Sequence, residues 1–407
     1  MIVKQYIKDF EKLGFGLFVH YGVYAGHGTG EWAKLSNNLS DAVYDDLINR
    51  FSPKENWAEE LVAAAKAAGC RYITLTTRHH DGFSLYDTCG LNTYDTAHCL
   101  GRDLVREFVD ACNAEGIIPF FYHTLLDWHE ESYRTDFPKY LAYLRESIAI
   151  LCKNYGKIGG FWFDGMWEKA DADWEEDALY GTIRQYQPEA MIINNTGLFA
   201  MGALGHMELD SVTFERGKPQ PINMEGAPKY VASEMCQILC DHWGYAREDL
   251  NYKAPAQMIR ELADCRRDRS NFLLNVGPMA DGSLRDIDRV TLGLMGQWVS
   301  YFDEALHLPA PTDIEIAGKP EDFLLKHENA YYLFCYDLPM KADPNVAVFA
   351  PHGYESKFRL PETVRSVTWL DNGEAVAFTQ NGEDVTVTTV PYTYGRNLVV
   401  RVAKIEC

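Results

Sequence analysis

Eight short apolar runs alternate with helical segments over about the first 300 residues, and this alternation limits the possible folds most strongly. The predicted strands are Phe15–Tyr21, Tyr72–Thr77, Ile117–Tyr122, Gly159–Gly165, Met191–Asn194, Val212–Phe214, Tyr230–Glu234 and Phe272–Val276. The predicted helices are Asn56–Ala68, Asp103–Glu115, Tyr140–Tyr155, Trp174–Tyr186, Pro255–Asp268 and Leu284–Leu306. Strands that alternate with helices in this way predict an α/β protein built as a (β/α)8-like barrel.

The pattern also predicts where the barrel is incomplete and where it ends. The segments after the fifth and sixth predicted strands are too short and irregular for full helices, so we expect one or two helices to be missing. After Leu308–Pro311 the chain changes to short runs separated by turns, with the pairs Asn372-Gly373 and Asn381-Gly382 between some of them. These later runs are Tyr331–Tyr336, Ala347–Ala350, Ser366–Trp369, Val385–Val390 and Leu398–Val402. We therefore predict a catalytic barrel over residues 1–308 and a small antiparallel β-sandwich over residues 312–407.

Charge and composition exclude some classes of partner. The formal net charge is −21, which repels phosphate backbones and anionic lipids, so we expect neither nucleic acid nor a membrane as a partner. Aromatic residues make up 13% of the chain and include 9 tryptophans, which suits stacking on sugar faces and equally suits a large aromatic core. A homo-oligomer is compatible with this composition.

The N-terminus and the cysteines bear on the cellular compartment. The first residues lack the apolar core of a signal peptide, and no run approaches the length of a transmembrane helix. The 10 cysteines include no C-x-x-C pair, and several, such as Cys70, Cys112 and Cys152, fall in or beside apolar helical stretches. We therefore predict reduced core thiols in a cytoplasmic protein.

Polar side chains end nearly every predicted strand. They are His20, His79, His80, His123, Asp164, Asn194, Asn195, Glu215, Glu234 and Asn275. The carboxyl ends of parallel barrel strands meet at one rim, which is where catalytic groups of such barrels lie. A single histidine or carboxylate there has ordinary structural explanations, but so many together predict a ligand site, a metal site or a dense hydrogen-bond network.

Asp164 is the most telling of these residues because it follows a fully apolar strand in the stretch G-G-F-W-F-D-G. A carboxylate is a poor residue for core packing, since burying an ion is costly unless it is paired. Asp164 is therefore either a cap for the next turn or a catalytic group. Phe161 and Phe163 are expected to pack the barrel against its helices.

The residues bear on four possible chemistries. Catalysis by a serine nucleophile has little support, because no G-x-S-x-G elbow follows a strand. Phosphate binding is also weakly supported, because the glycine-rich stretch Gly26–Gly30 lacks the lysine of a phosphate-binding loop. A metal-dependent hydrolase is the serious alternative, since the strand-end histidines and Asp164 could bind zinc, although no H-E-x-x-H helix is present. The remaining option is glycoside hydrolysis by two carboxylates, with Asp164 as nucleophile and either Glu215 or Glu234 as acid and base.

At these residues the chain resembles the α-L-fucosidases of glycoside hydrolase family 29, over about residues 10–300. The matching stretches are F-G-L-F-V-H-Y-G-V-Y (Phe15–Tyr24), G-E-W (Gly30–Trp32), T-T-R-H-H-D-G-F (Thr76–Phe83), R-D-L-V (Arg102–Val105), Y-H-T-L-L-D-W (Tyr122–Trp128), W-F-D-G (Trp162–Gly165), W-G-Y (Trp243–Tyr245) and N-F-L-L-N-V-G-P (Asn271–Pro278). Their order along the chain matches as well.

The resemblance implies roles for particular residues. Asp164 matches the nucleophile, Glu215 matches an acid/base in a D-x-x-T-x-E segment that starts at Asp210, and Glu234 is the alternative acid/base. The residues that match fucose-contacting positions are His20, Glu31, Trp32, His79, His80, His123, Trp162 and Trp243. No metal and no cofactor is implied. The chain departs from the family at Thr196, where many members carry an arginine.

The predicted function is therefore a retaining exo-α-L-fucosidase that removes terminal α-L-fucose from fucosylated oligosaccharides through a covalent fucosyl-enzyme. Two alternatives stay open: a metal-dependent barrel hydrolase and a catalytically inactive fucose-binding protein. The preferred linkage, the sugar that carries the fucose and the oligomeric state are not predicted.

Overall fold

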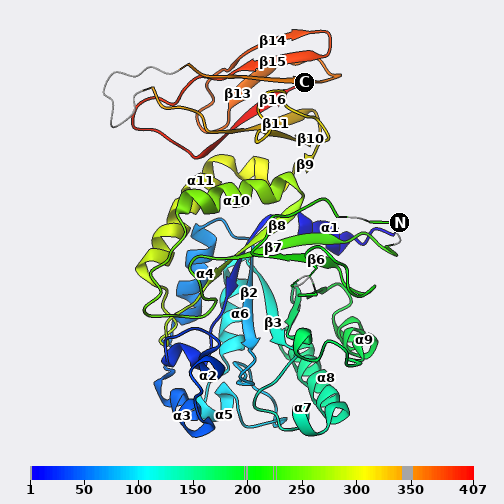
Figure 1. Cartoon of the computed structure of the whole chain (residues 1–407), viewed down its shortest axis with the longest axis vertical. Helices are drawn as coiled ribbons and strands as arrows, with labels where there is room; N and C mark the ends of the chain where they lie inside the picture. Colours follow the sequence, from blue (N-terminus) through cyan, green and yellow to red (C-terminus); the bar gives the residue numbers. More distant parts are fainter. Residues whose placement is uncertain (1, 197, 199, 223, 226, 342–351) are drawn as a thin grey trace. The chain divides into compact units, whose positions relative to one another are not determined.

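The computed structural model describes residues 2–196, 198, 200–222, 224–225, 227–341 and 352–407. The chain forms two compact units (Figure 1). The first consists of Met1–Lys253 and Ser270–Gly293, and the second of Ala254–Arg269 and Leu294–Cys407. These units divide the chain at other places than the predicted boundary between residues 308 and 312, so the limits of independently folding domains stay a prediction.

The first unit contains a closed barrel of eight parallel strands in chain order, which confirms the predicted fold class. The strands are β1 (Phe15–Val19), β2 (Tyr72–Arg78), β3 (Ile118–Thr124), β4 (Gly160–Asp164), β5 (Met191–Asn194), β6 (Ser211–Glu215), β7 (Ala232–Ile238) and β8 (Ser270–Val276). β1 pairs with β8 and closes the barrel, with Phe18 opposite Asn275. The carboxyl ends of all eight strands therefore lie at one rim.

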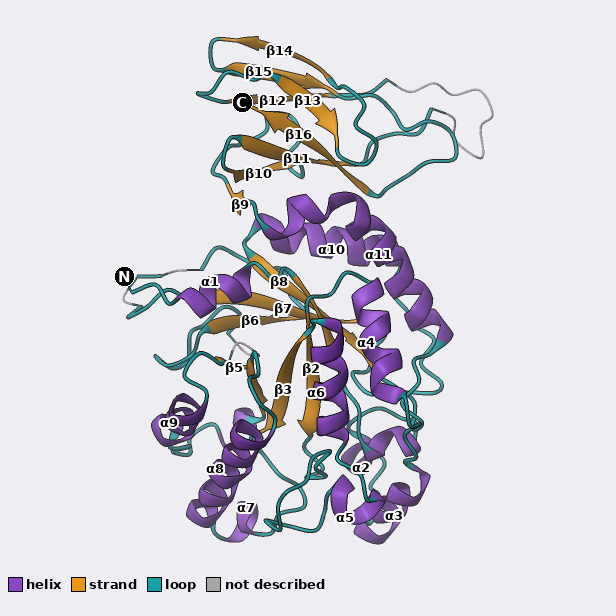
Figure 2. Ribbon diagram, turned by 180° about the vertical axis from the view of Figure 1, so that it is seen from behind, coloured by secondary structure: helices purple, strands orange, loops and turns teal. Residues whose placement is uncertain are grey.

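Helices follow most of the strands (Figure 2). Those of the first unit are α1 (Gln5–Glu11), α2 (Ala33–Ser36), α3 (Asp41–Asp45), α4 (Trp57–Ala67), α5 (Thr96–Leu100), α6 (Leu104–Glu115), α7 (Ser132–Thr135), α8 (Phe137–Asn154) and α9 (Glu176–Tyr186), with the 3-10 turns η1 (Val23–Gly26), η2 (Asp46–Arg50) and η3 (Met166–Lys169). α10 (Pro255–Arg267) follows β7, and α11 (Asp286–His307) follows β8. Within the described residues no helix follows β5 or β6, which confirms that two helices of a full barrel are missing.

Local sequence explains where the long helices begin and end. The Asp103 carboxylate accepts a hydrogen bond from the backbone N–H of Arg106 and caps the start of α6, and Gly116 ends this helix at a φ of 71°. Asp136 caps α8 in the same way, and Pro138 lies in its first turn. The predicted helices therefore rest on ordinary capping chemistry.

Two strands extend beyond the predicted limits, and this changes where their polar residues lie. β7 was predicted to end at Glu234 but continues to Ile238, and β3 continues past Tyr122 to Thr124. Glu234 and His123 are therefore inside strands and not at strand ends. Both are buried, and each finds hydrogen-bond partners there, which is why a polar residue does not interrupt the strand.

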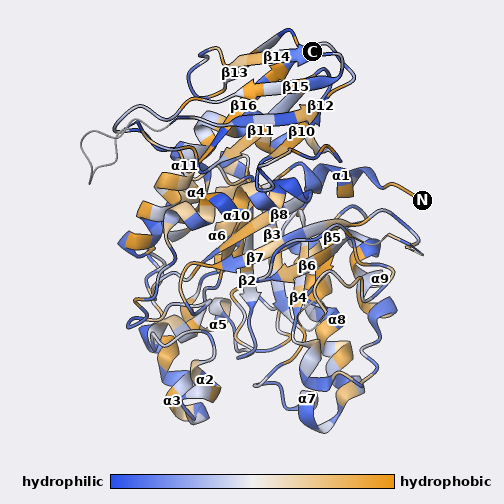
Figure 3. Ribbon diagram, turned by 45° about the horizontal axis from the view of Figure 1, so that its top comes forward, coloured by the Kyte–Doolittle hydropathy of each residue, from blue (hydrophilic) through white to orange (hydrophobic). Residues whose placement is uncertain are grey.

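The barrel interior is filled by side chains and is not a pore. Phe18, Tyr122 and Trp162 belong to one buried cluster that also includes Phe10 of α1 at the amino-terminal end of the strands. The barrel strands are mainly hydrophobic in Figure 3. Phe161 and Phe163 are fully buried on the other side of β4, with ring centroids 5.6 Å apart, as predicted.

The second unit contains two antiparallel sheets. One has the order β13-β16-β11-β10-β9 and the other β12-β15-β14. The strands are β9 (Ala310–Pro311), β10 (Phe323–His327), β11 (Ala330–Tyr336), β12 (Glu355–Arg359), β13 (Ser366–Trp369), β14 (Ala377–Asn381), β15 (Asp384–Thr388) and β16 (Val400–Glu406). A buried core that includes Leu333, Trp369 and Val387 lies in this unit, so the predicted sandwich is confirmed. The predicted strand Ala347–Ala350 lies outside the described residues.

All 10 cysteines are free, and Cys70, Cys112 and Cys152 are buried. None of the helices in the described part of the chain combines the length and the apolar character needed to cross a bilayer.

A buried carboxylate joins β5 and β6, where the barrel has its shortest ladder. Among the described residues, only Ile193 and Ser211 are in register between these two strands. Asp210, directly before β6, is completely buried and accepts a hydrogen bond from the backbone N–H of Ile192 at 2.9 Å. Ionic contacts from other elements therefore have to support this seam.

Two cations and a hydroxyl complete the environment of Asp210. Its carboxylate lies 2.5 Å from Nη2 of Arg184 and 2.7 Å from Nζ of Lys229, and it accepts a hydrogen bond from the Tyr6 hydroxyl at 3.1 Å. Arg184 is on α9, and Tyr6 is on α1. The carboxylate thus holds α1, α9, β5 and the start of β7 together in the part of the barrel that lacks helices.

We expect Asp210→Ala to destabilise the protein strongly, because it leaves Arg184 and Lys229 without their nearest carboxylate. The expected loss in the free energy of unfolding, measured by urea denaturation, is about 3 kcal/mol. Glu208→Ala is the control, because the Glu208 carboxylate is half exposed and lies farther from Arg184, at 3.6 Å, than the Asp210 carboxylate does. Its expected loss is below about 1 kcal/mol. Equal effects of the two substitutions would contradict the role given to Asp210.

Candidate active site

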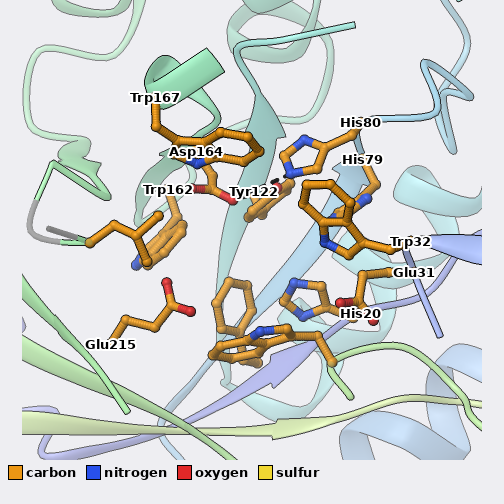
Figure 4. A pocket seen from close by; sticks show the side chains of 13 residues that line it. His20, Glu31, Trp32, His79, His80, Tyr122, Trp162, Asp164, Trp167 and Glu215 are labelled. Atoms are coloured by element: carbon orange, nitrogen blue, oxygen red, sulfur yellow. Dashed lines mark hydrogen bonds and ion pairs between the residues drawn. The ribbon is translucent and has the colours of Figure 1, made fainter. Parts of the chain in front are cut away.

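A cavity of about 100 Å³ opens at the carboxyl ends of the barrel strands (Figure 4). The residues that line it are Phe18, His20, Glu31, Trp32, His79, His80, Tyr122, Trp162, Asp164, Trp167, Leu198, Glu215 and Trp243. They come from β1, β3, β4 and β6 and from the loops that follow β1, β2, β4, β5 and β7. The rim predicted from the strand ends is therefore a real pocket.

Most residues singled out from the sequence line this pocket. Among them are both carboxylates of the predicted pair, Asp164 and Glu215. The other predicted residues in the lining are His20, Glu31, Trp32, His79, His80, Trp162 and Trp243.

Asp164 is the last residue of β4 and faces into the pocket (Figure 4). The chain can turn directly after it because Gly165 has a φ of 103°, a conformation that favours glycine. The Asp164 carboxylate accepts a hydrogen bond from the Tyr122 hydroxyl at 3.2 Å, and Nε2 of His80 lies 3.6 Å from it. Burial, and next the negative charge of Glu215, raise the pKa of Asp164 to about 7.

Asn195, the residue after β5, connects the two carboxylates. Its Nδ2 donates hydrogen bonds to Oε2 of Glu215 at 2.6 Å and to Oδ1 of Asp164 at 3.3 Å. Because both acceptor oxygens contact the same nitrogen, they lie within about 6 Å of each other. Burial raises the pKa of Glu215, and the hydrogen bond from Asn195 opposes this shift.

Three neutral imidazoles form another wall of the pocket. Burial lowers the pKa of His20 and of His80 to about 3, and that of His79 well below its ordinary value. Nδ1 of His20 is 2.7 Å from Oδ1 of Asn275, which fixes the orientation of that ring. Both His79 and His80 reach the pocket because β2 ends at Arg78, so the alternation of a strand no longer applies to them.

Glu31 and Trp243 are held by the loop that follows β7. The Glu31 carboxylate accepts a hydrogen bond from the backbone N–H of Gly244 at 2.8 Å, and burial raises the pKa of Glu31. The carbonyl oxygen of Trp243 accepts a hydrogen bond from Nδ2 of Asn275 at 2.7 Å. Neutral imidazoles, a carboxylate and indole rings are groups that can bind the hydroxyls and the apolar face of a sugar.

Glu234 and His123 do not line the pocket. Glu234 lies deeper in the barrel, where its two oxygens accept hydrogen bonds from the Tyr72 hydroxyl at 2.5 Å and from Nε1 of Trp162 at 2.9 Å. Burial raises the pKa of Glu234 to about 7. Both oxygens of this carboxylate therefore have partners within the barrel.

His123 is on the opposite side of β3 from the pocket, because side chains alternate along a strand and Tyr122 faces inward. Its Nδ1 is 2.7 Å from the carbonyl oxygen of Thr124, and the Tyr86 hydroxyl is 3.4 Å from its Nε2. His123 therefore packs behind the strand, and a direct contact with a ligand in the pocket is not available to it.

The sequence analysis did not single out Tyr122 or Trp167, and it placed Asn195 at the rim without giving it a partner. Tyr122 is in register with Trp162 on the neighbouring strand, so the alternation that places Trp162 inward could have identified it. Trp167 stacks on Trp32 with ring centroids 5.7 Å apart, but it lies in the 3-10 turn η3, for which no periodicity is readable. The contacts of Asn195 depend on two other strands and have no local signal.

The described residues contain no group of three or more histidine, cysteine, aspartate or glutamate side chains arranged to hold a metal ion. Two of the pocket histidines have other partners: His20 contacts Asn275, and Nδ1 of His80 is 2.7 Å from the Thr124 hydroxyl.

Comparison with known proteins gives consistent matches. Residues 3–304 match the family model described as α-L-fucosidase. The tissue α-L-fucosidase of Bos taurus is 28% identical over 341 residues, which cover 75% of this chain and 70% of that protein.

Solved structures match over nearly the whole chain. α-L-Fucosidase isoenzyme 1 from Paenibacillus thiaminolyticus has a TM-score of 0.82 and 26% identity, covering 99% of this chain and 98% of that one. An α-L-fucosidase from Bacteroides thetaiotaomicron, trapped as a covalent intermediate with 2-fluoro-fucosyl fluoride, has a TM-score of 0.80 and 21% identity, covering 99% and 96%. The second of these supports the fold.

The raised pKa of Asp164 predicts a stability that depends on pH. Asp164 keeps its proton up to about pH 7 in the folded chain, whereas it loses the proton near pH 3.8 in the unfolded chain. This group therefore stabilises the fold at low pH, and the stabilisation is lost as the pH rises towards 7. Asp164→Asn removes the buried charge. The difference in free energy of unfolding, variant minus wild type, should therefore be roughly 2 kcal/mol larger at pH 8 than at pH 5. Urea denaturation at both pH values measures it.

Asp177→Asn is the matched control, since the Asp177 side chain is 95% exposed. It should follow the wild type at both pH values. A difference between Asp164→Asn and the wild type that stays constant with pH would show that Asp164 is ionised in the fold at both values.

Proposed function

The chain belongs to the α-L-fucosidase family of glycoside hydrolases, and from this premise we propose that it removes terminal α-L-fucose from fucosylated oligosaccharides by a retaining double displacement. Asp164 is the proposed nucleophile and Glu215 the proposed acid and base. The observation that carries the proposal is the shared hydrogen bonding of these two carboxylates by the amide of Asn195.

The separation of the carboxylates favours retention over inversion. Retaining glycosidases place their two carboxyl groups about 5–5.5 Å apart, whereas inverting enzymes need about 6.5–9.5 Å to fit a water molecule. The shared contact with Nδ2 of Asn195 keeps the Asp164 and Glu215 oxygens within about 6 Å of each other, which is less than inversion needs. A covalent intermediate, such as the one trapped in the Bacteroides relative, is what this route would produce.

In the first step an Asp164 oxygen forms a bond to the anomeric carbon of fucose. The bond from that carbon to the leaving oxygen breaks, and the proton of Glu215 passes to the leaving oxygen. In the second step a water oxygen forms a bond to the anomeric carbon, the ester bond to Asp164 breaks, and Glu215 takes the water proton. Proton transfer by a well-placed group contributes about 10²–10⁴-fold to the rate.

The remaining lining residues suit the fucose itself. His20, His79 and His80 are neutral and can donate or accept hydrogen bonds with hydroxyl groups. The indole of Trp243 contacts Phe18 and His20, with ring centroids 5.8 and 5.1 Å away, and offers an apolar surface for the methyl group of fucose. We propose that Glu31 and Trp32 bind further hydroxyls.

Glu234 is the alternative acid/base. Against it stand its two hydrogen bonds to Tyr72 and Trp162 and its absence from the pocket lining. We propose that Glu234 instead orients Trp162 as a wall of the fucose site.

The proposed roles predict different effects for the two carboxylates on aryl α-L-fucosides. Asp164→Ala should abolish turnover, because no covalent intermediate can form. Glu215→Ala should still react once with a substrate that has a good leaving group, and added azide should then restore turnover by replacing the water that lacks a base. The measurements are the burst and the steady-state rate of aryl release with and without azide.

Glu234→Ala serves as the comparison in the same assay, and azide should not restore its activity. Full activity in Glu215→Ala together with azide rescue in Glu234→Ala would transfer the acid/base role to Glu234.

The anomer released first tests the stereochemistry, and a panel of aryl glycosides tests the substrate. Proton NMR of the early reaction should show α-L-fucose, because two inversions at the same carbon give net retention. β-L-Fucose as the first product would indicate inversion. Cleavage of other α-linked sugars in preference to fucose would change the proposed substrate.

The two alternative functions also have direct tests. A metal-dependent hydrolase should lose activity with a chelator, and an inactive fucose-binding protein should be stabilised by fucose while cleaving no fucoside. A cytoplasmic location, in which the enzyme meets short imported oligosaccharides, stays a prediction.

A further inference from the structure

Asn195 hydrogen-bonds to both of the strands that end in the two carboxylates. Its backbone N–H donates to the carbonyl oxygen of Phe163 at 2.9 Å, so its main chain is tied to β4, the strand that ends in Asp164. Its Oδ1 accepts a hydrogen bond from the Thr213 hydroxyl at 3.2 Å, so its side chain is tied to β6, the strand that ends in Glu215. The side chain is 6% exposed.

The contact with Thr213 also fixes which end of the amide faces the carboxylates. A hydroxyl that donates to Oδ1 leaves Nδ2 directed at Asp164 and Glu215, and both of its hydrogens are then used. If the amide were reversed, its oxygen would point at two carboxylates. The direction of the amide is therefore determined by its partners on both sides.

We propose that Asn195 is a positioning residue, whose amide holds Asp164 and Glu215 at their working separation and transfers its hydrogen bonding towards Glu215 as the reaction proceeds. This inference rests on the proposed double displacement. An uncharged side chain then couples the nucleophile to the acid/base.

The chemistry of the two steps requires such a transfer. In the form of the free enzyme that reacts, Asp164 must be ionised and Glu215 must hold a proton, whereas in the covalent intermediate Asp164 is a neutral ester and Glu215 must be an ionised base. An ester oxygen accepts a hydrogen bond more weakly than a carboxylate does. The 3.3 Å contact to Asp164 is thus the one that weakens, and the 2.6 Å contact to Glu215 then stabilises the ionised base.

A neutral amide suits this place better than a charged group. An arginine or lysine would strongly favour two ionised carboxylates and would oppose the protonated acid of the first step. An aspartate would add a third negative charge at hydrogen-bond distance from both carboxylates.

The other groups around the pair act on one carboxylate each. His80, Tyr122 and Trp167 face Asp164, and Arg216 is the cation near Glu215. The Cys236 thiol lies near both, and burial raises its pKa well above the ordinary value, so it is neutral. Among the described residues, Asn195 alone hydrogen-bonds both carboxylates.

The test compares the pH profiles of kcat/KM for an aryl α-L-fucoside in the wild type, Asn195→Ala and Asn195→Asp. In Asn195→Ala we expect kcat to fall by roughly 10²-fold, as for other losses of alignment, with a smaller change in KM. Both limbs of the profile should move to higher pH, because the amide no longer stabilises either ionised carboxylate. In Asn195→Asp the limbs should move by about one pH unit or more, since a like charge is added.

Asn194→Asp is the matched control, with the same chemical change one residue earlier. Nδ2 of Asn194 donates to the Tyr180 hydroxyl at 2.9 Å, on the helix side of β5 and away from the pocket. Like Asn195→Asp, this variant buries a new carboxylate, so the two should lose stability for the same reason. Both limbs of its pH profile should nevertheless lie at the same pH as in the wild type.

Two results would overturn the proposal. One is a wild-type kcat in Asn195→Ala, and the other is a lowered rate in both Asn195 variants with neither limb displaced, which a purely structural role would give.

Failure of the proposed function is a separate outcome, because the wild type would then cleave no α-L-fucoside. The inference is still testable in that case by ¹³C NMR titration of the carboxyl groups, with Asp164→Asn and Glu215→Gln used to identify the two signals. Both signals should titrate at higher pH in Asn195→Ala than in the wild type, and unchanged titration would reject the role of Asn195.

Discussion

The burial of carboxylates inside a barrel of apolar strands is the constraint on which the rest of this structure depends. A buried ion is costly unless it is paired or hydrogen-bonded, and the protein meets this cost in two different ways. Glu234 is fully enclosed, and the Tyr72 hydroxyl and the Trp162 indole satisfy it. Asp164 is satisfied in part, by Tyr122 and Asn195, and its remaining side faces the pocket. The first arrangement supports Trp162, and the second leaves a carboxylate exposed to the pocket, which is the proposed nucleophile.

The part of the barrel that carries Asn195 and Glu215 is also the part that lacks helices after its strands. β5 and β6 have a single residue pair in register among the described residues, and the buried Asp210 joins them to α1 and α9 through Tyr6 and Arg184. Charged side chains stabilise these strands, whereas apolar packing of helices stabilises the strands on the other side of the barrel. The position of Glu215 relative to Asp164 therefore depends on an ionic network some distance below the pocket.

The sequence contained enough information for the barrel and for most of the pocket, and the failures have a common physical reason. Alternating apolar runs and helical spacing depend on local sequence, and so do the strand ends that place Asp164, His79 and His80. Whether a polar residue ends a strand or is accommodated within it depends on partners elsewhere, such as Tyr72 for Glu234. The same holds for Asn195, whose contacts come from β4 and β6, and for Trp167, which lies in a short turn.

The three buried imidazoles have a consequence for the sugar that the pocket is proposed to hold. Glycoside cleavage passes through an oxocarbenium-like transition state, in which positive charge develops on the sugar ring. A protonated histidine against that ring would oppose this charge, but burial keeps His20, His79 and His80 uncharged far below neutral pH. The imidazoles of the pocket therefore add no positive charge that would oppose the developing cation. The carboxylates attract it, and the faces of the indole rings in the lining can attract it as well.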